Sequence, residues 1–167
     1  MTLRLRALPV RSTIAKRSAR TACVGGTTAL AMFAAAGIAL AGQPPATTPD
    51  QTEANRLMNL TADDFGLAPQ NPPFDWSNNG CSGPTRPEFT PACVQHDFGY
   101  RNYGARGDLG FAVIRDTKDW IDQRFHEEMY RICEDYASVP QAATQCIQDA
   151  DNAFTAVQLF GDSSFFR

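Results

Sequence analysis

The spacing of apolar residues predicts that most of the chain after residue 50 is helical. Helical periodicity extends over about residues 111–136 and again over 143–160, where Gly161 would end the second helix. The apolar positions of the first segment are Ile114, Ile121, Phe125, Met129 and Ile132. Those of the second are Ile147, Phe154, Val157, Leu159 and Phe160. No segment shows the alternation typical of a strand, so the pattern predicts an all-α protein.

A third helix is expected over residues 88–103. It is preceded by a segment, 69–91, that holds six prolines together with several asparagines and glycines, which predicts an irregular loop. It is followed by Gly104, Gly107 and Gly110, which break the helical pattern before the next helix begins.

The region just before these helices is less regular. Residues 50–60 predict a short amphipathic helix with Leu57 and Leu60 facing the core. The preceding residues, 42–49, are rich in Pro, Thr and Ala and predict a flexible leader or pro-segment. We therefore divide the processed chain into a leader with a short helix, 42–60, and a folded domain, 61–167.

The first 41 residues have the composition of a secretory signal. Six Lys/Arg residues and no acid precede an apolar run, Val24–Ala41, which ends in the A-x-A sequence Ala39–Ala41. The alternative is a transmembrane anchor, but 18 residues are close to the lower limit for a span, and glycines and threonines dilute them. Secretion with cleavage after Ala41 is the favoured interpretation. No transmembrane span is then expected in the processed chain.

Removal of that signal changes the charge of the protein. All 18 acidic residues but only 9 of the 15 basic residues follow Ala41, so residues 42–167 carry a net charge of −9, against −3 for the whole chain. Nucleic-acid binding depends on Lys/Arg contacts with phosphates, so a nucleic-acid partner is not expected. The length allows one domain with one modest core, and we expect a monomer.

Cysteine number agrees with export. Cys23 lies in the signal, and four cysteines remain in a small domain, which predicts two disulfides. Three pairings of these four residues are possible. Zinc is a poor alternative because no C-x₂₋₄-C spacing is present.

The segment Cys93–Tyr103 concentrates residues with chemical capability. Read as a helix, it places Cys93, His96, Asp97 and Tyr100 within roughly one 100° face. This face combines a disulfide anchor, a base with an ordinary pKa near 6.5, a carboxylate and a phenol. Packing alone seldom requires these four residue types together.

The motif C-x-x-H-D-F-G-Y-R-N-Y in this segment resembles that of the secreted phospholipase A2 superfamily, and HDFGYRNY in particular is similar to its bacterial and fungal branch. Weaker similarity extends over Phe74–Ser77, Arg131–Tyr136 and Ala156–Gly161. The resemblance implies a small disulfide-stapled helical domain, in which two long antiparallel helices carry a catalytic His and Asp. It also implies the disulfides Cys81–Cys93 and Cys133–Cys146.

The activity implied by the resemblance is calcium-dependent hydrolysis of the sn-2 ester of glycerophospholipids at a lipid interface, giving a lysophospholipid and a free fatty acid. His96 corresponds to the general base, Asp122 to the carboxylate that orients it, and Tyr100 to a supporting tyrosine. From the helical pattern itself, Asp122 lies about 60° from the centre of the apolar stripe and should be partly buried, where it needs a donor. The chain has no G-x-S-x-G motif, which argues against a serine hydrolase.

The resemblance also implies a Ca²⁺ site. Asp97 would provide a carboxylate, and Asn79 with the Gly80 carbonyl would stand where the family has an acidic side chain and the carbonyl that follows it. Because Asn79 is neutral, we expect weaker calcium binding than in members with Asp at this position. Asp75 could compensate in part, although a turn cap beside Trp76 is the favoured interpretation.

Two further residues have a structural interpretation. His126 could compete with His96 for Asp122, but we expect His126 at the surface, and we expect Tyr103 in the core. Head-group selection is assigned to residues 82–90 and 104–116. A non-catalytic lipid- or protein-binding module on the same scaffold, with a weakened calcium site, is the alternative function.

Overall fold

The computed structural model describes residues 42–167, which form helical elements and no strand within that range. The proposed secretory signal, its cleavage position after Ala41 and Cys23 lie outside the described residues. The all-α class predicted from the apolar pattern is confirmed.

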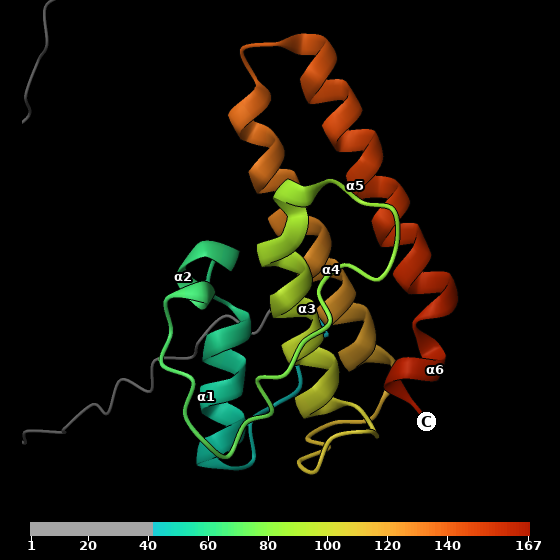
Figure 1. Cartoon of the computed structure of the whole chain (residues 1–167). Coiled ribbons are helices and arrows are strands. Elements are labelled where there is room, and N and C mark those ends of the chain that lie inside the picture. Colours follow the sequence, from blue (N-terminus) through green and yellow to red (C-terminus); the bar gives the residue numbers. More distant parts are fainter. Residues whose placement is uncertain (1–41) are drawn as a thin grey trace, which may run out of the picture. The chain divides into compact units, whose positions relative to one another are not determined.

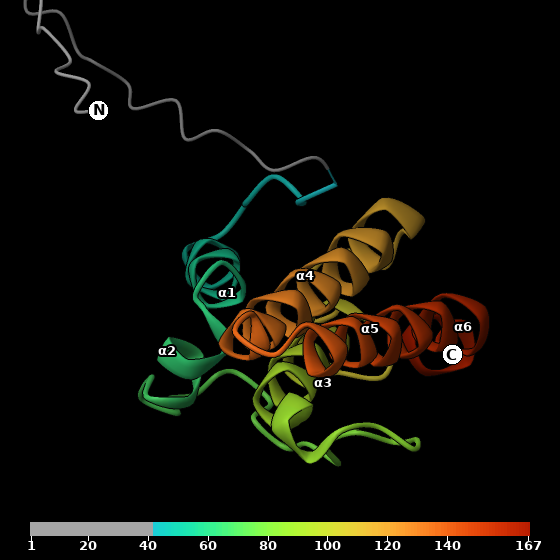
Figure 2. The same cartoon turned by 90° about the horizontal axis from the view of Figure 1, so that it is seen from above.

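Three long helices form the centre of the fold. They are α3 (Thr90–Tyr103), α4 (Arg115–Cys133) and α5 (Pro140–Phe160). The α4 helix packs against both of the others, and Figure 1 shows that it runs antiparallel to each. Seen from above in Figure 2, α4 and α5 lie side by side. The 3₁₀ turn η2 (Glu134–Tyr136) joins them, as η1 (Pro87–Phe89) precedes α3.

Two short helices precede the long ones, and a third follows them. Thr48 caps the start of α1 (Pro49–Met58), where its hydroxyl accepts from Gln51 N at 3.1 Å, and Thr61 caps α2 (Ala62–Gly66) in the same way. Both contact α3. The last element, α6 (Asp162–Phe165), packs on α3 and α5.

The residues before α1 form hydrogen bonds with that helix. Asn55 Nδ2 donates to the Pro44 carbonyl at 2.9 Å, and Thr47 N donates to Gln51 Oε1 at 3.0 Å. Polar side chains of α1 thus satisfy backbone groups of residues 42–49. The flexible leader expected from their composition stays a prediction. The expected domain boundary at residue 60 stays a prediction.

Where α3 crosses α4, Gly99 packs closely against the side chain of Ile121. A Cβ at Gly99 would lie 2.7 Å from Ile121 Cγ2 and 3.1 Å from Met58 Cε, so only glycine fits without a shift. Phe98, Tyr103 and Ile121 are buried in the same apolar cluster. A second cluster, with Phe89, Phe125 and Met129, fills the space around the disulfides. The close approach of α3 and α4 sets the distance between their side chains at the site described below.

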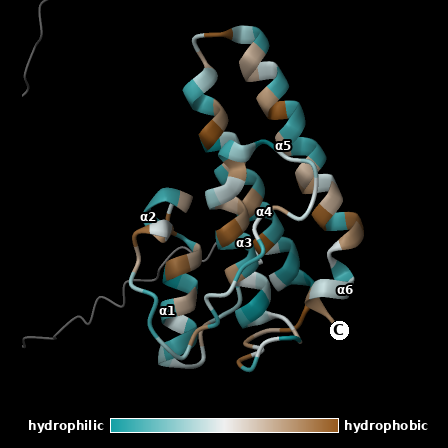
Figure 3. Cartoon of the chain, in the orientation of Figure 1, coloured by the Kyte–Doolittle hydropathy of each residue, from teal (hydrophilic) through white to brown (hydrophobic). Residues whose placement is uncertain are grey.

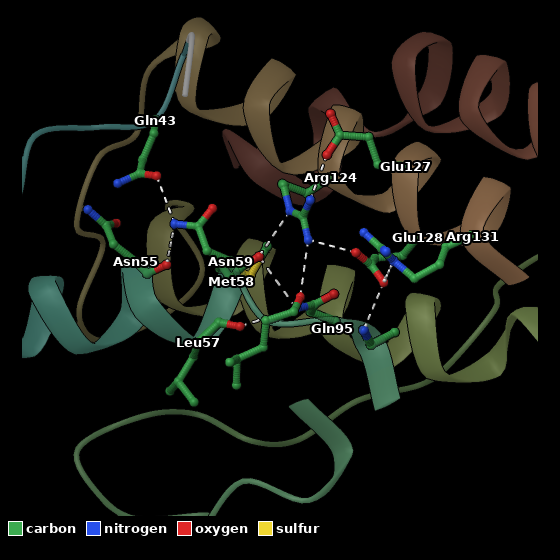
Figure 4. Close-up of polar contacts among 12 residues, drawn as sticks. Gln43, Asn55, Leu57, Met58, Asn59, Gln95, Arg124, Glu127, Glu128 and Arg131 are labelled. Carbon is green, nitrogen blue, oxygen red and sulfur yellow. Dashed lines mark hydrogen bonds and ion pairs between the residues drawn. The ribbon is translucent and has the colours of Figure 1, made fainter. Parts of the chain in front are cut away.

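Figure 4 shows a buried polar network that joins α4 to the end of α1 and the start of α2. Arg124 donates to the carbonyls of Met58 and Leu60 at 3.2 and 3.1 Å, and to Glu128 Oε1 at 2.7 Å. Glu128 Oε2 accepts from Ala62 N at 2.9 Å. This pair therefore satisfies orphan backbone groups at the end of one helix and the start of the next.

The two disulfides pair as the resemblance implied. Cys81–Cys93 joins the loop before η1 to α3, with the two Cα atoms 5.2 Å apart. Cys133–Cys146 joins the end of α4 to α5, with a Cα–Cα distance of 5.6 Å. The paired cysteines are close in sequence, with separations of 12 and 13 positions respectively.

Several expected helix limits need correction. The helix predicted over 50–60 ends at Met58, and the one predicted over 88–103 begins at Thr90, after η1. The helix predicted over 111–136 begins only at Arg115, and its last residues form η2. The helix predicted over 143–160 begins at Pro140, because proline fits the first helical turn, where no N–H is needed. The short helices α2 and α6 were not predicted.

The predicted apolar stripes are only partly buried. Ile121, Phe125 and Met129 lie in the core, but Ile114 is 54% exposed. On α5 the buried residues are Cys146, Ala150 and Ala153, whereas Leu159 and Phe160 are 67% and 75% exposed. Figure 3 shows hydrophobic and hydrophilic residues interspersed along α4 and α5. None of the helices between residues 42 and 167 combines the length and hydrophobicity that a bilayer span requires.

Candidate active site

His96 and Asp122 face each other across the contact between α3 and α4. His96 Nε2 lies 2.9 Å from Asp122 Oδ1, and the Asp122 side chain has no exposed surface. The His96 side chain retains 10% of its exposure and forms part of the wall of a cavity of about 460 Å³. The pair that the sequence predicted is therefore brought together, with the histidine on the open side.

The carboxylate of Asp122 is fully engaged. Tyr100 Oη donates to the same oxygen as His96, at 2.8 Å, and Lys118 Nζ donates to the other oxygen, Oδ2, at 2.7 Å. Burial by itself would raise the pKa of Asp122, but the bonds from His96 and Lys118 outweigh it and leave that pKa below its usual value. Asp122 is thus a buried anion with donors on both oxygens.

This arrangement determines which nitrogen of His96 is left for chemistry. An ionised carboxylate only accepts hydrogen bonds, so Nε2 must carry the hydrogen that points to Asp122. Nδ1 of the neutral ring is then an unprotonated base. The ring is held between Tyr100 and Phe125, whose ring centroids lie 4.2 and 4.8 Å from its own.

The residues expected at a calcium site lie together at the same cavity. Asp97 Oδ2 accepts from the backbone nitrogens of Asn79 and Gly80, at 2.8 and 2.9 Å. Gly80 adopts φ of +64°, a left-handed conformation that favours glycine. Asn79, Gly80 and Asp97 all line the cavity beside His96.

The oxygen ligands at this position fit a hard cation. Only one of them, Asp97, is acidic, whereas a site that binds calcium more strongly would have two acidic side chains. The carboxylate of Asp97, the amide oxygen of Asn79 and the carbonyl of Gly80 are the oxygen ligands that Ca²⁺ prefers. Asn79 Oδ1, however, accepts from Arg101 Nη2 at 3.2 Å, and Asn79 Nδ2 donates to Ser82 Oγ at 2.6 Å. Between residues 42 and 167 no group of three or more His, Cys, Asp or Glu side chains could hold a metal.

The residues with competing interpretations lie elsewhere. Asp75 Oδ1 caps its own turn by accepting from Ser77 N at 2.8 Å. His126 contacts Asp151 rather than Asp122, at 2.8 Å, and its ring stacks on that of Phe154. Tyr103 is buried and donates to Asn55 Oδ1.

Two basic residues at the site were missed. Lys118 precedes Asp122 by one helical turn, so the spacing places both on one face of α4, but a charged pair at this spacing is usually a surface pair. Arg101 stands within the HDFGYRNY motif and lines the cavity together with Arg106. Residues of α5, among them Ala153, Val157 and Phe160, also line the cavity.

The chain is similar in sequence to two curated proteins named secretory phospholipase A2. A secretory phospholipase A2 of Arthroderma benhamiae is 33% identical over 101 residues, which cover 55% of this chain and 64% of that protein. A secretory phospholipase A2 of Beauveria bassiana is 35% identical over 92 residues, or 53% of this chain and 44% of the relative. The chain thus spans less than two thirds of the length of these relatives.

The family model described as prokaryotic phospholipase A2 matches residues 57–161, a range that runs from α1 to the end of α5 and includes both disulfides. His96, Asp122, Tyr100 and the calcium-site candidates all lie within it. The chain belongs to the prokaryotic phospholipase A2 family.

Proposed function

We propose that this protein is a secreted, calcium-dependent phospholipase A2 that hydrolyses the sn-2 ester of glycerophospholipids. The observation that carries the proposal is the His96–Asp122 pair, with Nε2 and Oδ1 2.9 Å apart, at the wall of a cavity. Family membership and the two relatives named secretory phospholipase A2 support both the activity and secretion.

His96 would act as general base. Its Nδ1 takes a proton from a water molecule as the water oxygen attacks the ester carbonyl, and Asp122 stabilises the imidazolium that forms. The same proton then passes from Nδ1 to the leaving glycerol oxygen as the ester bond breaks. No covalent intermediate on the protein is needed.

Tyr100 would keep Asp122 in position through this cycle. Burial, and next the charge of Asp122, raise the pKa of Tyr100 well above its ordinary value, so its hydroxyl stays a donor. His96 and Tyr100 share Oδ1 of Asp122, with distances of 2.9 and 2.8 Å, which limits rotation of the carboxylate.

Asp97, Asn79 and the Gly80 carbonyl would hold the calcium ion. A bound ion would supply positive charge for the ester carbonyl oxygen and for the substrate phosphate. The backbone donors of Asn79 and Gly80 hold Asp97 Oδ2, so the loop and the carboxylate are already joined before an ion binds.

The cavity walls fit a molecule with one apolar and one anionic part. Ala153, Val157 and Phe160 offer an apolar wall, and Arg101 and Arg106 lie among the other lining residues. A net charge of −9 over residues 42–167 opposes adsorption to anionic membranes by charge alone. Apolar contact would have to contribute, and the exposed Leu159 and Phe160 at the end of α5 are suited to it.

The test is release of fatty acid from sn-2-labelled phosphatidylcholine by the purified protein with both disulfides formed, with calcium or with chelator. Calcium-dependent release is expected, and His96→Ala should abolish it. His126→Ala is the matched control, because this second histidine pairs with Asp151 and should leave release unchanged. Absence of release from the folded protein at millimolar calcium would refute the proposal.

The alternative is a non-catalytic lipid-binding module. It is favoured by the contact of Arg101 with Asn79 Oδ1, since the guanidinium occupies an oxygen that calcium would need. This alternative predicts calcium-independent binding to phosphatidylcholine vesicles without release of fatty acid, so the same preparations distinguish the two functions.

A further inference from the structure

Residues 42–167 contain a single lysine, and it is fully buried. All other basic residues in this range, apart from the two histidines, are arginines, whereas Lys118 has 0% exposure. Lysine is almost never buried in this way unless its ammonium group is paired. The position therefore requires a specific partner.

The ammonium group contacts three oxygens. Lys118 Nζ lies 2.7 Å from Asp122 Oδ2 and 3.0 Å from the Val157 carbonyl. The third oxygen, Asp162 Oδ1, is farther away at 3.7 Å. Asp162 is half exposed and already forms two bonds of 2.7 and 2.6 Å with Arg115, so Asp122 is the main charged partner of Lys118.

The contacts of Asp122 are divided between its two oxygens. Oδ1 receives His96 and Tyr100, and Oδ2 receives Lys118. Without Lys118, Oδ2 would be a buried charged oxygen with no donor, and rotation of the carboxylate toward a new donor would weaken the bond to His96. The lysine thus completes the arrangement that keeps Oδ1 directed at Nε2.

We propose that Lys118 is a positioning residue for the proposed hydrolysis, and that it acts by holding Oδ2 of Asp122 so that Oδ1 orients His96. The inference rests on the proposed function, in which His96 is the base. Lys118 is not among the residues that line the cavity and makes no hydrogen bond with His96, so it would act on His96 through Asp122.

The second bond of Lys118 links this carboxylate to the cavity wall. The Val157 carbonyl accepts from Gly161 N at 2.9 Å as well as from Lys118. Val157 and Gly161 both line the cavity. Lys118 therefore joins the orienting carboxylate on α4 to the junction of α5 and α6, where the substrate would lie.

An arginine would not serve equally well here. The lysine ammonium is a compact charge with three hydrogens, whereas the guanidinium is a planar fork that needs more space. Gly161 leaves little room, because a Cβ at that position would lie 3.2 Å from Lys118 Cε. Lys118→Arg is therefore expected to retain only part of the wild-type hydrolysis.

The fold contains a matched control for burial alone. Arg124 and Glu128 form a second buried pair on α4 with the same spacing of four residues, and neither lines the cavity. Breaking this pair with Glu128→Gln should disturb folding in the same manner as a change at Lys118. It should leave His96 unaffected.

The first measurement is the tautomer of His96, read from the NMR signals of its ring nitrogens. It does not depend on enzyme activity. The chain has two histidines, so ¹⁵N-ring labelling gives two sets of signals, and His126→Gln assigns them. Above the pH range in which histidines titrate, wild type should show one tautomer with the hydrogen on Nε2. Lys118→Met should mix the tautomers or lose the hydrogen-bonded proton, and Glu128→Gln should retain both.

The second readout is hydrolysis of a monomeric short-chain phosphatidylcholine. Lys118→Met should lower kcat by about 10- to 100-fold, a usual loss for a residue that orients another, with KM nearly unchanged. Lys118→Gln, which retains donors but not the charge, replaces the methionine variant if that variant does not fold.

The outcomes separate the two proposals. A single His96 tautomer that persists in folded Lys118→Met or Lys118→Gln would overturn the positioning role. Mixed His96 tautomers in wild type would overturn it as well. So would a change of the His96 tautomer in Glu128→Gln equal to that in the Lys118 variant. Absence of fatty-acid release from wild type with the expected tautomer would instead refute the hydrolase and leave the role of Lys118 in orienting His96 supported.

Discussion

Gly161 lies directly against the hydroxyl group of Tyr100. A Cβ at position 161 would be 2.5 Å from Tyr100 Oη, too close for any real contact. Since that hydroxyl donates to Asp122 at 2.8 Å, the residue that ends α5 also limits how the carboxylate of the candidate site is held.

A Cβ at Gly161 would also overlap the Val157 carbonyl, so Gly161→Ala should shift the end of α5 and displace Tyr100 from Asp122. We expect a loss of stability of about 1–3 kcal/mol from overpacking, together with a lower kcat. Gly66→Ala is the matched control, because a Cβ there meets nothing within 4 Å and the change should be neutral or slightly stabilising. Urea unfolding and fatty-acid release measure the two effects. Equal behaviour of the two variants would contradict the steric argument.

Asn79→Asp should strengthen calcium binding. The change adds a formal charge to a site whose acidic ligand is Asp97, and we expect an affinity gain on the order of tenfold. Arg101→Gln should act in the same direction, because it releases Asn79 Oδ1 from its 3.2 Å contact. Calorimetric titration with calcium measures both variants.

Arg56→Gln is the control for those two variants. It removes an arginine whose partner is the exposed Glu53, and it should leave calcium affinity unchanged. No gain in Asn79→Asp would show that the missing charge does not limit this site.

The two disulfides should have different roles. Cys81–Cys93 holds the loop that carries Asn79 and Gly80, so replacing both cysteines by serine should weaken calcium binding as well as folding. Replacing Cys133 and Cys146 should mainly lower stability. The chain-entropy model gives about 3 kcal/mol for a loop of this length. Comparing calcium affinity in the two folded variants tests this, and an equal loss in both would refute it.

Asp122 should make the protein lose stability in acid. Its pKa is lowered on folding, so the unfolded chain takes up the proton first as the pH falls. The contribution of Asp122 is then fully present above about pH 4, near the ordinary pKa of Asp, and is lost as the pH falls through the lower folded value.

Thermal unfolding measured over a pH series checks this dependence. Asp122→Asn should flatten the decline below pH 4, because the titrating group is gone. Asp75, Asp151 and Asp162 also have lowered pKa values. Asp75 and Asp151 are exposed and Asp162 is half exposed, so solvent screens their pairs and each should contribute little. An unchanged decline in Asp122→Asn would assign it to these surface groups.

Much of the site was predictable because it depends on local patterns. The HDFGYRNY motif placed His96, Asp97 and Tyr100 on one helical face, and the apolar stripe of α4 placed Asp122 beside that face. The structure brings His96, Tyr100 and Asp122 into contact as expected. Their catalytic roles, and the roles of Asn79, Gly80 and Asp97 toward calcium, stay predictions.

Other features depend on contacts between residues far apart in the chain. The short helices α2 and α6 span too few residues to show a period. The exposure of Leu159 and Phe160 follows from which face of α5 meets α4, where the small Ala150 and Ala153 pack, and apolar spacing does not reveal that choice.

Lys118 shows most clearly the difference between what local spacing predicts and what long-range packing determines. Its spacing from Asp122 is visible in the sequence, because residues four apart share a helical face. Its burial is not, since it requires the carbonyl of Val157, 39 residues later, and the junction of α5 and α6 to cover it. Helical periodicity could assign Asp122 a side of α4, but long-range packing determines which groups surround its carboxylate and how strongly they hold it.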